Sequence, residues 1–599
     1  MRNRMLSVLV GAAVFGPVAA GSQPVLQPQS REDFSRLLSP GLFSFQLTPE
    51  KLQQLRTEAS KDCFDPDSFQ RAVPALKPDQ KRPLPCAPQN AFDRFVMWNQ
   101  IALDTTSIDH APPPPGVMSN QALHHLGPHR ASRAMAIVHI AMFDAINMWD
   151  RFNPAHPSKR NYTFETYSKL SELKKPASLD LVITYAAGEI LKALYKEQAP
   201  VIADFMTQDE TVIVKGNSPN DPLFKEAREL GRAAAKAILE IRKNDGSAHN
   251  EPEVGQPGFE LSETPGQWRP DPVSNIIAAL GGKWSGVRPF AIQNLPTFRP
   301  PPPPPLVSAR YKKDFDEVKT LGGQNTPRYT STRTDEQTII GTFWAYDGTA
   351  FLCAPPRLYN QIIRQIVQQK TAEMKKNGEE PRVLNYARLF ALANIAMADA
   401  AIAAWDAKYH FRYWRPVVGI RAAEGDGNPD TEADFYWRAL GAPASNSIRG
   451  PNFTPPFPAY PSGHATFGGA LFQVLRNFYP EQTAFTVASD EYNGINKPVG
   501  SDIPRPVIPP RPFANFQAAE DENARSRIYL GVHWQVDADA GIAQGNQVGS
   551  FVAAKALRCL TPEGLPTDCR PQGGNEIFQR FLISTEKRLL TTPKAAPQQ

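Results

Sequence analysis

Three short segments in the C-terminal half of the chain concentrate side chains that bind oxyanions. The first places Arg415 after Lys408 with six residues between them, the second is the Pro-Ser-Gly-His sequence of residues 461–464, and the third places His533 after Arg527 with five residues between them. Lysine offers a compact charge, arginine a planar fork of N–H donors, and neutral imidazole can ligate a metal or act as a nucleophile. The combination predicts a pocket for one tetrahedral oxyanion, with His533 bonded directly to its central atom.

A predicted helix N-terminus contributes to this pocket. Apolar residues at helical spacing predict a helix over residues 464–478, so Ser462 and Gly463 stand where that helix begins. Free N–H groups and the positive end of the helix dipole would then face the anion. Lys408 is expected at the C-terminal end of a long apolar helix that starts near residue 383.

The third segment requires a break in its helix. On one continuous helix, Arg527 and His533 would point roughly 240° apart. Gly531 lies between them and makes a helix end plausible, which would let both side chains enter one pocket. Asp537, one helical turn after His533, is either the partner that orients the imidazole ring or a carboxylate near a helix N-terminus.

The joint pattern resembles the superfamily that unites vanadium haloperoxidases with class A bacterial acid phosphatases and related lipid phosphatases. A longer similarity to fungal-type vanadium chloroperoxidases spans about residues 335–539, and it includes the segments 343–348, 355–362, 388–392 and 455–460. The 61 residues between His464 and Ser526 also exceed the compact phosphatase spacing. The resemblance therefore favours a haloperoxidase.

This resemblance implies a vanadate cofactor and assigns roles to ten residues. The cofactor-binding residues would be Lys408, Arg415, Ser462, Gly463, His464, Arg527 and His533, with His533 as the metal ligand. Catalytic roles would fall to His464, Lys408, His533 and Asp347, and Asp347 would pair with Arg527. Trp405 and Phe457 would flank the halide, although aromatic residues at such positions can equally be core packing.

The implied reaction uses hydrogen peroxide to oxidise chloride or bromide to hypohalous acid, with His464 as the base and an organic acceptor that the sequence does not identify. The alternative is an acid phosphatase in which His533 attacks phosphorus and His464 protonates the leaving alcohol. A third interpretation is a non-catalytic oxyanion-binding protein of the cell envelope. That interpretation requires neither His464 nor the aromatic pair.

Composition and residue patterns predict the fold class. The 599 residues are 41% apolar, which allows a sizeable core, and strand patterns are sparse. An all-α fold of two helical bundles is predicted, with the vanadate site in the second. The net charge of +5 is too small at this length to indicate a nucleic-acid partner. No membrane span is expected in the mature chain, and a homodimer is possible.

Composition shifts along the chain predict six regions. They are a signal peptide (1–20), an N-terminal arm (21–90), a first bundle (91–295), a Pro-rich linker (296–309), a second bundle (310–560) and a C-terminal tail (561–599). The linker contains six consecutive prolines, residues 300–305, which cannot form helix or sheet core. Arg2 and Arg4 followed by an apolar run are typical of an export signal, so a secreted or periplasmic protein is expected.

The cysteines and a group of histidines complete the sequence-based expectations. Cys63 with Cys86, and Cys559 with Cys569, are close enough in sequence to form disulfides in an oxidising compartment, with Cys353 left over, unless all five are free thiols. Three histidines near the start of the first bundle have no nearby carboxylate or cysteine in the sequence and are interpreted as structural or surface residues: His124, His125 and His129.

Overall fold

The computed structural model describes residue 63 and residues 84–111, 124–152, 163–171, 177–378, 382–561 and 565–567. The predicted signal peptide lies outside the described residues, as do most of the predicted N-terminal arm and C-terminal tail. Helices dominate the described chain, and each strand is two or three residues long. The predicted all-α fold is confirmed.

The helices fall into an N-terminal and a C-terminal group. The first group consists of α4 (Ala91–Asp109), α5 (Gly127–Phe152), α6 (Leu179–Leu194), α7 (Ala199–Val214) and α8 (Pro222–Arg242). The second consists of α9 (Ala309–Leu321), α10 (Asp335–Phe343), α11 (Pro355–Lys376), α12 (Val383–Phe411), α13 (Pro416–Arg421), α14 (Gly463–Arg476), α15 (Phe516–Tyr529) and α16 (Gln535–Lys555).

The remaining elements are short. Single 3-10 turns are found at Lys196–Gln198, Trp284–Gly286, Leu295–Phe298, Ala423–Gly425 and Asp490–Tyr492. Strand β4 (Cys559–Leu560) pairs antiparallel with β1 (Thr163–Phe164) and with β5 (Pro566–Thr567), so the end of the second group is tied to the first. Strands β2 (Phe485–Val487) and β3 (Arg511–Phe513) form a separate antiparallel pair.

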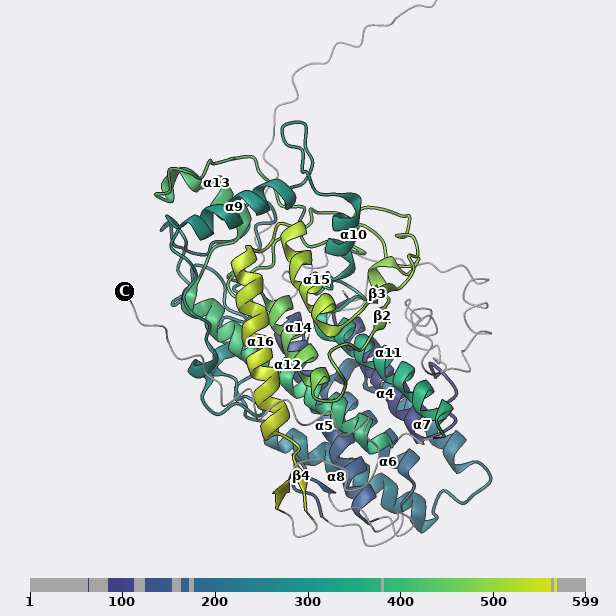
Figure 1. Ribbon diagram of the computed structural model, residues 1–599. Helices are drawn as coiled ribbons and strands as arrows, with labels where there is room; N and C mark the ends of the chain where they lie inside the picture. Colours follow the sequence, from purple (N-terminus) through teal and green to yellow (C-terminus); the bar gives the residue numbers. More distant parts are fainter. Residues whose placement is uncertain are drawn as a thin grey trace, which may run out of the picture.

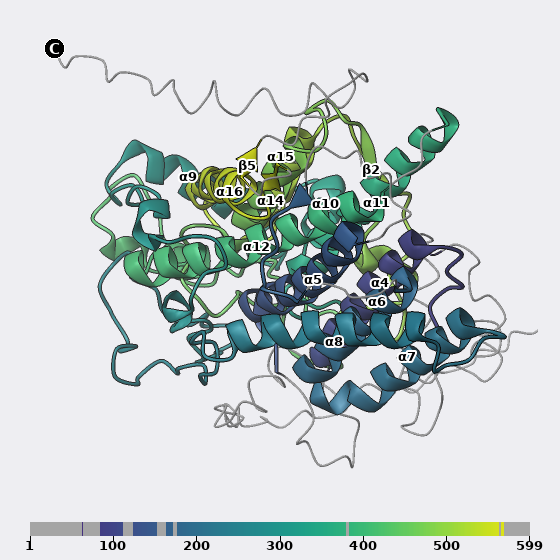
Figure 2. The ribbon, with the colours of Figure 1, turned by 90° about the horizontal axis from the view of Figure 1, so that it is seen from below.

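Helix α12 is the member of the second group that packs most extensively against the first. It packs against α5 on one side and against α14 and α16 on the other, as both views show (Figures 1 and 2). One apolar core includes buried residues of both groups, such as Phe95, Met142, Leu392 and Leu471. The domain boundaries themselves stay a prediction, since the core is continuous across them.

Polar residues inside α12 are matched by partners from the first half of the chain and from α11. The Asp399 carboxylate accepts the backbone N–H groups of Phe290, Ala291 and Ile292 at 2.6–2.9 Å. By length and composition α12 could cross a membrane, but 94% of its most apolar window is buried inside the protein. It is the central helix of the core.

Helices α14 and α16 approach each other unusually closely. Gly541, Gly545 and Gly549 repeat every fourth residue on the α16 face that meets α14. A Cβ atom at Gly545 would lie 2.2 Å from the carbonyl oxygen of Thr466, so only glycine fits there. This contact places the N-terminus of α14 beside the chain that enters α16.

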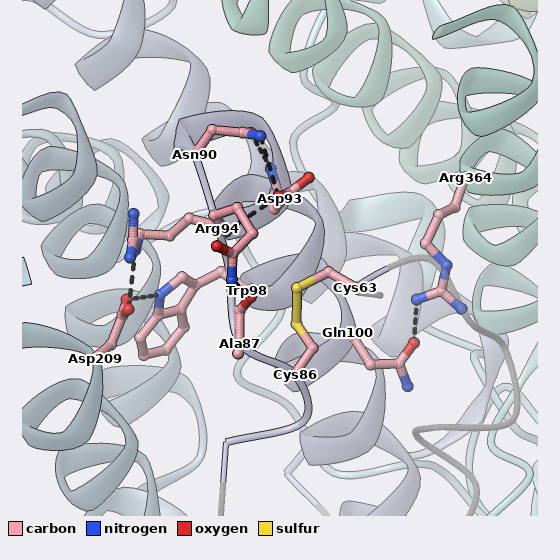
Figure 3. The surroundings of a disulfide bond; sticks show 11 residues. Cys63, Cys86, Ala87, Asn90, Asp93, Arg94, Trp98, Gln100, Asp209 and Arg364 are labelled. Atoms are coloured by element: carbon pink, nitrogen blue, oxygen red, sulfur yellow. Dashed lines mark hydrogen bonds and ion pairs between the residues drawn. A yellow bond between two sulfur atoms is a disulfide. The ribbon is translucent and has the colours of Figure 1, made fainter. Parts of the chain in front are cut away.

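A disulfide bond lies beside α4 (Figure 3). Cys63 and Cys86 are joined as predicted, with their Cα atoms 5.1 Å apart. Cys559 is also disulfide-bonded, but its predicted partner, Cys569, lies outside the described residues. Cys353 is a buried free cysteine, as predicted.

Two of the three histidines near the start of the first bundle have carboxylate partners that are distant in sequence. His124 pairs with Glu197 at 2.6 Å, and His129 lies 3.3 Å from Glu251. Among the described residues, no group of His, Cys, Asp and Glu side chains is arranged to hold a metal ion.

Candidate active site

The three predicted segments meet at one place between the helix ends. Lys408 lies in the last turn of α12, Arg415 caps α13, and Arg527 lies in the last turn of α15. His533 stands in the short connection between α15 and α16. A small cavity of about 20 Å³ is lined by Arg527 and His533 together with His464.

The imidazole of His533 is held by hydrogen bonds at both nitrogens. Nδ1 lies 2.8 Å from Oδ2 of Asp537, and the same oxygen accepts the backbone N–H of Trp534 at 3.0 Å. Asp537 therefore fulfils both roles considered from the sequence, since it orients the ring and caps α16. Gly531, with a φ of 70°, follows the end of α15, and the break predicted there is present.

The other ring nitrogen of His533 faces Arg415. Nη1 of Arg415 lies 2.9 Å from Nε2 of His533 and also donates to the carbonyl of Val532 at 2.7 Å. With Nδ1 donating to Asp537, Nε2 carries the lone pair and is the nitrogen able to bind an electrophilic centre. Burial, followed by the nearby cations, holds the pKa of His533 well below its ordinary value, so the ring is neutral.

Arg527 is paired with a carboxylate. Its Nη2 donates to Oδ1 of Asp347 at 2.7 Å, and both side chains are buried. This is the pairing implied by the family resemblance. Burial raises the pKa of Asp347, whereas Arg527 lowers it. The Nε and Nη1 donors of Arg527 have no hydrogen-bond partner among the described residues.

The N-terminus of α14 presents further donors. Ser462 occupies the N-cap position, yet its hydroxyl makes no capping hydrogen bond and has no partner in the described part of the chain. The backbone of Ser462 is fixed instead by its N–H, which donates to the carbonyl of Asp537 at 2.8 Å. The first N–H groups of the helix, beginning with Gly463, point away from the helix body at this end.

Lys408 differs from the sequence-based expectation. Its ammonium donates to the carbonyls of Pro458 and Ala459 at 2.9 Å each, and to the carbonyl of Pro461. An ammonium has three N–H donors, so all three are directed at the backbone that leads into α14. Burial and Arg415 hold the pKa of Lys408 well below its ordinary value.

His464 is fixed in one tautomer. Its Nε2 lies within hydrogen-bond distance of the carbonyl oxygen of Ala345, and because a carbonyl can only accept, Nε2 carries the proton. Nδ1 is left with the lone pair. Burial and the surrounding cations, with Arg527 first, hold the pKa of His464 well below its ordinary value. A neutral imidazole with a lone pair can accept a proton.

Two aromatic rings form a wall beside these groups. The ring centroids of Trp405 and Phe457 are 5.0 Å apart. The Phe457 ring lies 5.1 Å from the Lys408 ammonium and 4.9 Å from the Arg415 guanidinium, so it covers both cations. Both aromatic residues line the cavity.

The donors of this site fit a tetrahedral oxyanion. Four buried donor atoms have no partner among the described residues: Oγ of Ser462, Nη2 of Arg415, and Nε and Nη1 of Arg527. A buried donor left without an acceptor costs roughly 1–3 kcal/mol. An ion with several acceptor oxygens would satisfy these donors, and the neutral Nε2 of His533 is a suitable ligand for a central metal such as vanadium.

The sequence of this chain is similar to those of known proteins. Residues 388–562 match the family model described as the VCPO second helical-bundle domain. Vanadium chloroperoxidase from Curvularia inaequalis is 36% identical over 342 residues. Over residues 388–562 the chain therefore resembles the second helical-bundle domain of vanadium chloroperoxidases. The match covers 49% of this chain and 54% of that relative, so it spans about half of the relative's length.

Solved structures share the fold of this chain. A bacterial vanadium-dependent iodoperoxidase superposes with a TM-score of 0.59 at 22% identity, covering 80% of this chain and 99% of the other. A holo-type bacterial vanadium-dependent chloroperoxidase gives a TM-score of 0.50 at 16% identity, covering 76% and 96%. At these identities the likeness concerns the fold.

Sequence reasoning missed the residues that the first half of the chain contributes to this site. Gly127 and Pro128 at the start of α5, and Leu280 in the later connection, line the cavity. The Leu280 carbonyl accepts Nε1 of Trp405 at 2.9 Å. The Gly-Pro pair is typical of a helix start. No sequence pattern indicates that this helix start lies at the same cavity as Trp405.

Proposed function

We propose that the protein is a vanadium-dependent haloperoxidase that oxidises chloride or bromide with hydrogen peroxide. The observation that carries this proposal is the convergence of unpartnered buried donors from Ser462, Arg415 and Arg527 on the neutral ring of His533. The 36% identity to a vanadium chloroperoxidase supports the same conclusion.

Vanadate would be held by His533 through Nε2 and by the donors of Arg415, Arg527, Ser462 and the α14 N-terminus. When bound, it supplies a Lewis acid that activates hydrogen peroxide. Binding at Nε2 replaces the Arg415 N–H as the partner of that nitrogen. Asp537 keeps the proton on Nδ1 and so keeps the lone pair on Nε2.

The other residues move protons and exclude water. Nδ1 of His464 is the base available to take a proton from hydrogen peroxide, because Nε2 is engaged with Ala345. Lys408 holds three carbonyls of the segment before α14, and we propose that it also strengthens the positive potential at the anion. Trp405 and Phe457 form the apolar wall that a weakly hydrated halide can approach.

We also propose that the protein is exported. The Cys63–Cys86 disulfide supports an oxidising compartment such as the periplasm or the exterior. A homodimer is part of the proposal. Light scattering on the purified mature chain tests the assembly, and N-terminal sequencing of the protein from its producing cells tests cleavage of the signal peptide.

The function is tested by reconstitution. Metal-free protein is assayed for halogenation of a phenol-type indicator with peroxide and bromide, before and after addition of vanadate. We expect activity only with vanadate, and we expect excess phosphate during loading to suppress it, because both oxyanions need the same donors. Full activity without vanadium, or hydrolysis of a phosphate ester in place of halogenation, contradicts the proposal.

A further inference from the structure

A second and much larger cleft lies on the first group of helices. It has a volume of about 1010 Å³ and is bounded by α5, the end of α6, α8 and the connection that follows α8. Ligand sites for small molecules are typically about 300–1,000 Å³. The cleft is therefore large enough for an organic molecule, whereas an inorganic ion would occupy only a small part of it.

Cationic side chains dominate the rim of the cleft. Lys196 and Lys236 are exposed and have no charged partner among the described residues. Arg232 is exposed as well and reaches Glu189 only at 3.4 Å, and Lys243 lies 3.7 Å from Glu240. Exposed pairs at such distances contribute little stability, so these cations are free to meet another anion.

The floor of the cleft is fixed by arginines that pair with largely buried carboxylates. Arg130 pairs with Glu251 at 2.7 Å. Arg133 and Arg242 share Asp245, at 2.7 Å and 2.8 Å. These buried pairs set the shape of the floor, and the exposed cations lie at the rim.

An apolar surface with an unsatisfied donor lies within the same cleft. Trp284 lines it together with Leu194 and Leu239. The Trp284 indole contacts the Arg130 guanidinium at 5.3 Å and the His249 ring at 5.9 Å. Its Nε1–H is buried and has no partner in the described part of the chain, and the same holds for Nε2 of His249.

We propose that this cleft binds a small organic anion with a flat aromatic body, such as an aryl carboxylate or sulfonate. The acidic group would meet the lysines of the rim, and the aromatic body would lie against the half-buried Leu194 and Leu239. Such a ligand combines a negative charge with apolar area, whereas an inorganic anion would leave the two leucines uncovered.

The cleft is separate from the proposed active site but adjacent to it. The Trp284 ring lies 4.6 Å from the His129 ring, which lies 5.3 Å from the Trp405 ring of the halide wall. The ligand site is thus separated from the reaction pocket by two side chains. Binding there requires neither vanadate nor halide, so its test is independent of the proposed activity.

Calorimetric titration with 2-naphthalenesulfonate tests the proposal on the full chain without vanadate. We expect one site per chain, and an affinity reduced about tenfold or more by the double change Lys196→Glu and Lys236→Glu. Lys225→Glu is the matched control, because Lys225 is exposed on α8 but does not line the cleft. It should leave the affinity unchanged.

Two competitors complete the experiment. Neutral 2-naphthol should bind at least about tenfold more weakly, because it lacks the charge that the lysines recognise. Sodium sulfate at equal concentration should not displace the naphthalenesulfonate. The proposal is overturned if the double variant binds as tightly as the parent, if sulfate displaces the probe, or if no binding is detected.

Discussion

Arg415 and Arg527 have different electrostatic surroundings, although the sequence motif predicts the same oxyanion-binding role for both. Arg527 has the carboxylate of Asp347 at 2.7 Å. Arg415 donates only to two carbonyls and an imidazole, and burial lowers its pKa to about 9. Without an anion, Arg415 is a buried cation with no salt-bridge partner in the described chain, and this makes the two arginines energetically distinguishable.

The first prediction compares Arg527→Met with Arg415→Met. The change at Arg527 leaves Asp347 buried without its partner and should lower the free energy of unfolding of the vanadate-free protein by about 3–5 kcal/mol. The change at Arg415 removes an uncompensated charge and should cost clearly less. Urea unfolding measures both values, and equal losses would contradict this account. Equilibrium dialysis should show weaker vanadate binding by both variants.

The second prediction concerns the halide wall. Phe457→His places a polar group and water beside the cations, which weakens their field at the reaction pocket. The ratio of chloride to bromide kcat/KM should fall, because chloride is harder to oxidise. Phe457→Leu keeps the wall apolar and serves as the control, with a ratio close to that of the parent. An unchanged ratio in Phe457→His would identify Phe457 as a packing residue.

At the scale of residues, the sequence predicts which side chains lie together, but not which hydrogen-bond partners each of them has. The spacing of Lys408, Arg415, Arg527 and His533 was sufficient to predict one pocket. The three carbonyl partners of Lys408 were beyond the sequence, because they depend on the path of the backbone before α14. Every residue type has a main-chain carbonyl, so the residue types do not indicate which carbonyls Lys408 contacts.

At the scale of elements, the close contact of α14 with α16 determines the distance between Ser462 and the chain around His533. A Cβ atom at Gly541 would lie 2.7 Å from the carbonyl oxygen of Ser462 itself. The bounds of α14 were predicted to within a few residues from apolar spacing. The glycine repeat was not used, because glycine is a poor helix former and predicts no packing partner on its own.

The third prediction is that Gly545→Ala separates α14 from α16. The added Cβ would meet backbone atoms, so we expect a loss of about 1–3 kcal/mol in the free energy of unfolding, although alanine is the better helix former. Vanadate affinity should fall as well, because the N-terminus of α14 moves. Gly425→Ala is the control, since nothing lies within 4 Å of its new Cβ. Urea unfolding and dialysis measure the two effects.

The fourth prediction concerns the contact of α5 with α12. The His139 ring stacks on Phe390 with centroids 5.5 Å apart, its Nδ1 donates to the carbonyl of Met135, and its Nε2 accepts Nδ2 of Asn99 at 3.0 Å. Burial lowers the pKa of His139 from 6.5 to about 4. Below pH 6.5 the unfolded chain therefore binds a proton that the folded protein does not.

Stability should accordingly fall as the pH decreases from 6.5 towards 4, with a contribution from His139 of up to about 1.4 kcal/mol per pH unit. Urea unfolding across this range measures the slope. His139→Gln should be less stable than the parent, but its slope should be smaller. His410→Gln, at an exposed histidine of α12, should leave the slope unchanged. An identical slope in His139→Gln would contradict the assignment.

At the scale of the whole molecule, the reaction pocket is completed by both halves of the chain. Gly127 and Pro128 come from the first group of helices, whereas His464 and His533 come from the second. An ionic contact crosses the same boundary, since Arg357 of α11 binds Asp104 of α4 at 3.1 Å. The sequence predicted two bundles, but it could not predict that they share one core.

The position of α12 has a consequence for heat denaturation. A helix that contributes to the core of both groups cannot lose one neighbour without exposing its own apolar surface, so neither group should melt alone. Differential scanning calorimetry should record one heat-absorption peak, with a calorimetric enthalpy equal to the van't Hoff enthalpy. Two resolved peaks would show that the halves melt independently. With a single peak, a substitution in the first group of helices would lower the melting temperature of the vanadate pocket as much as one beside His533 that costs the same free energy of unfolding.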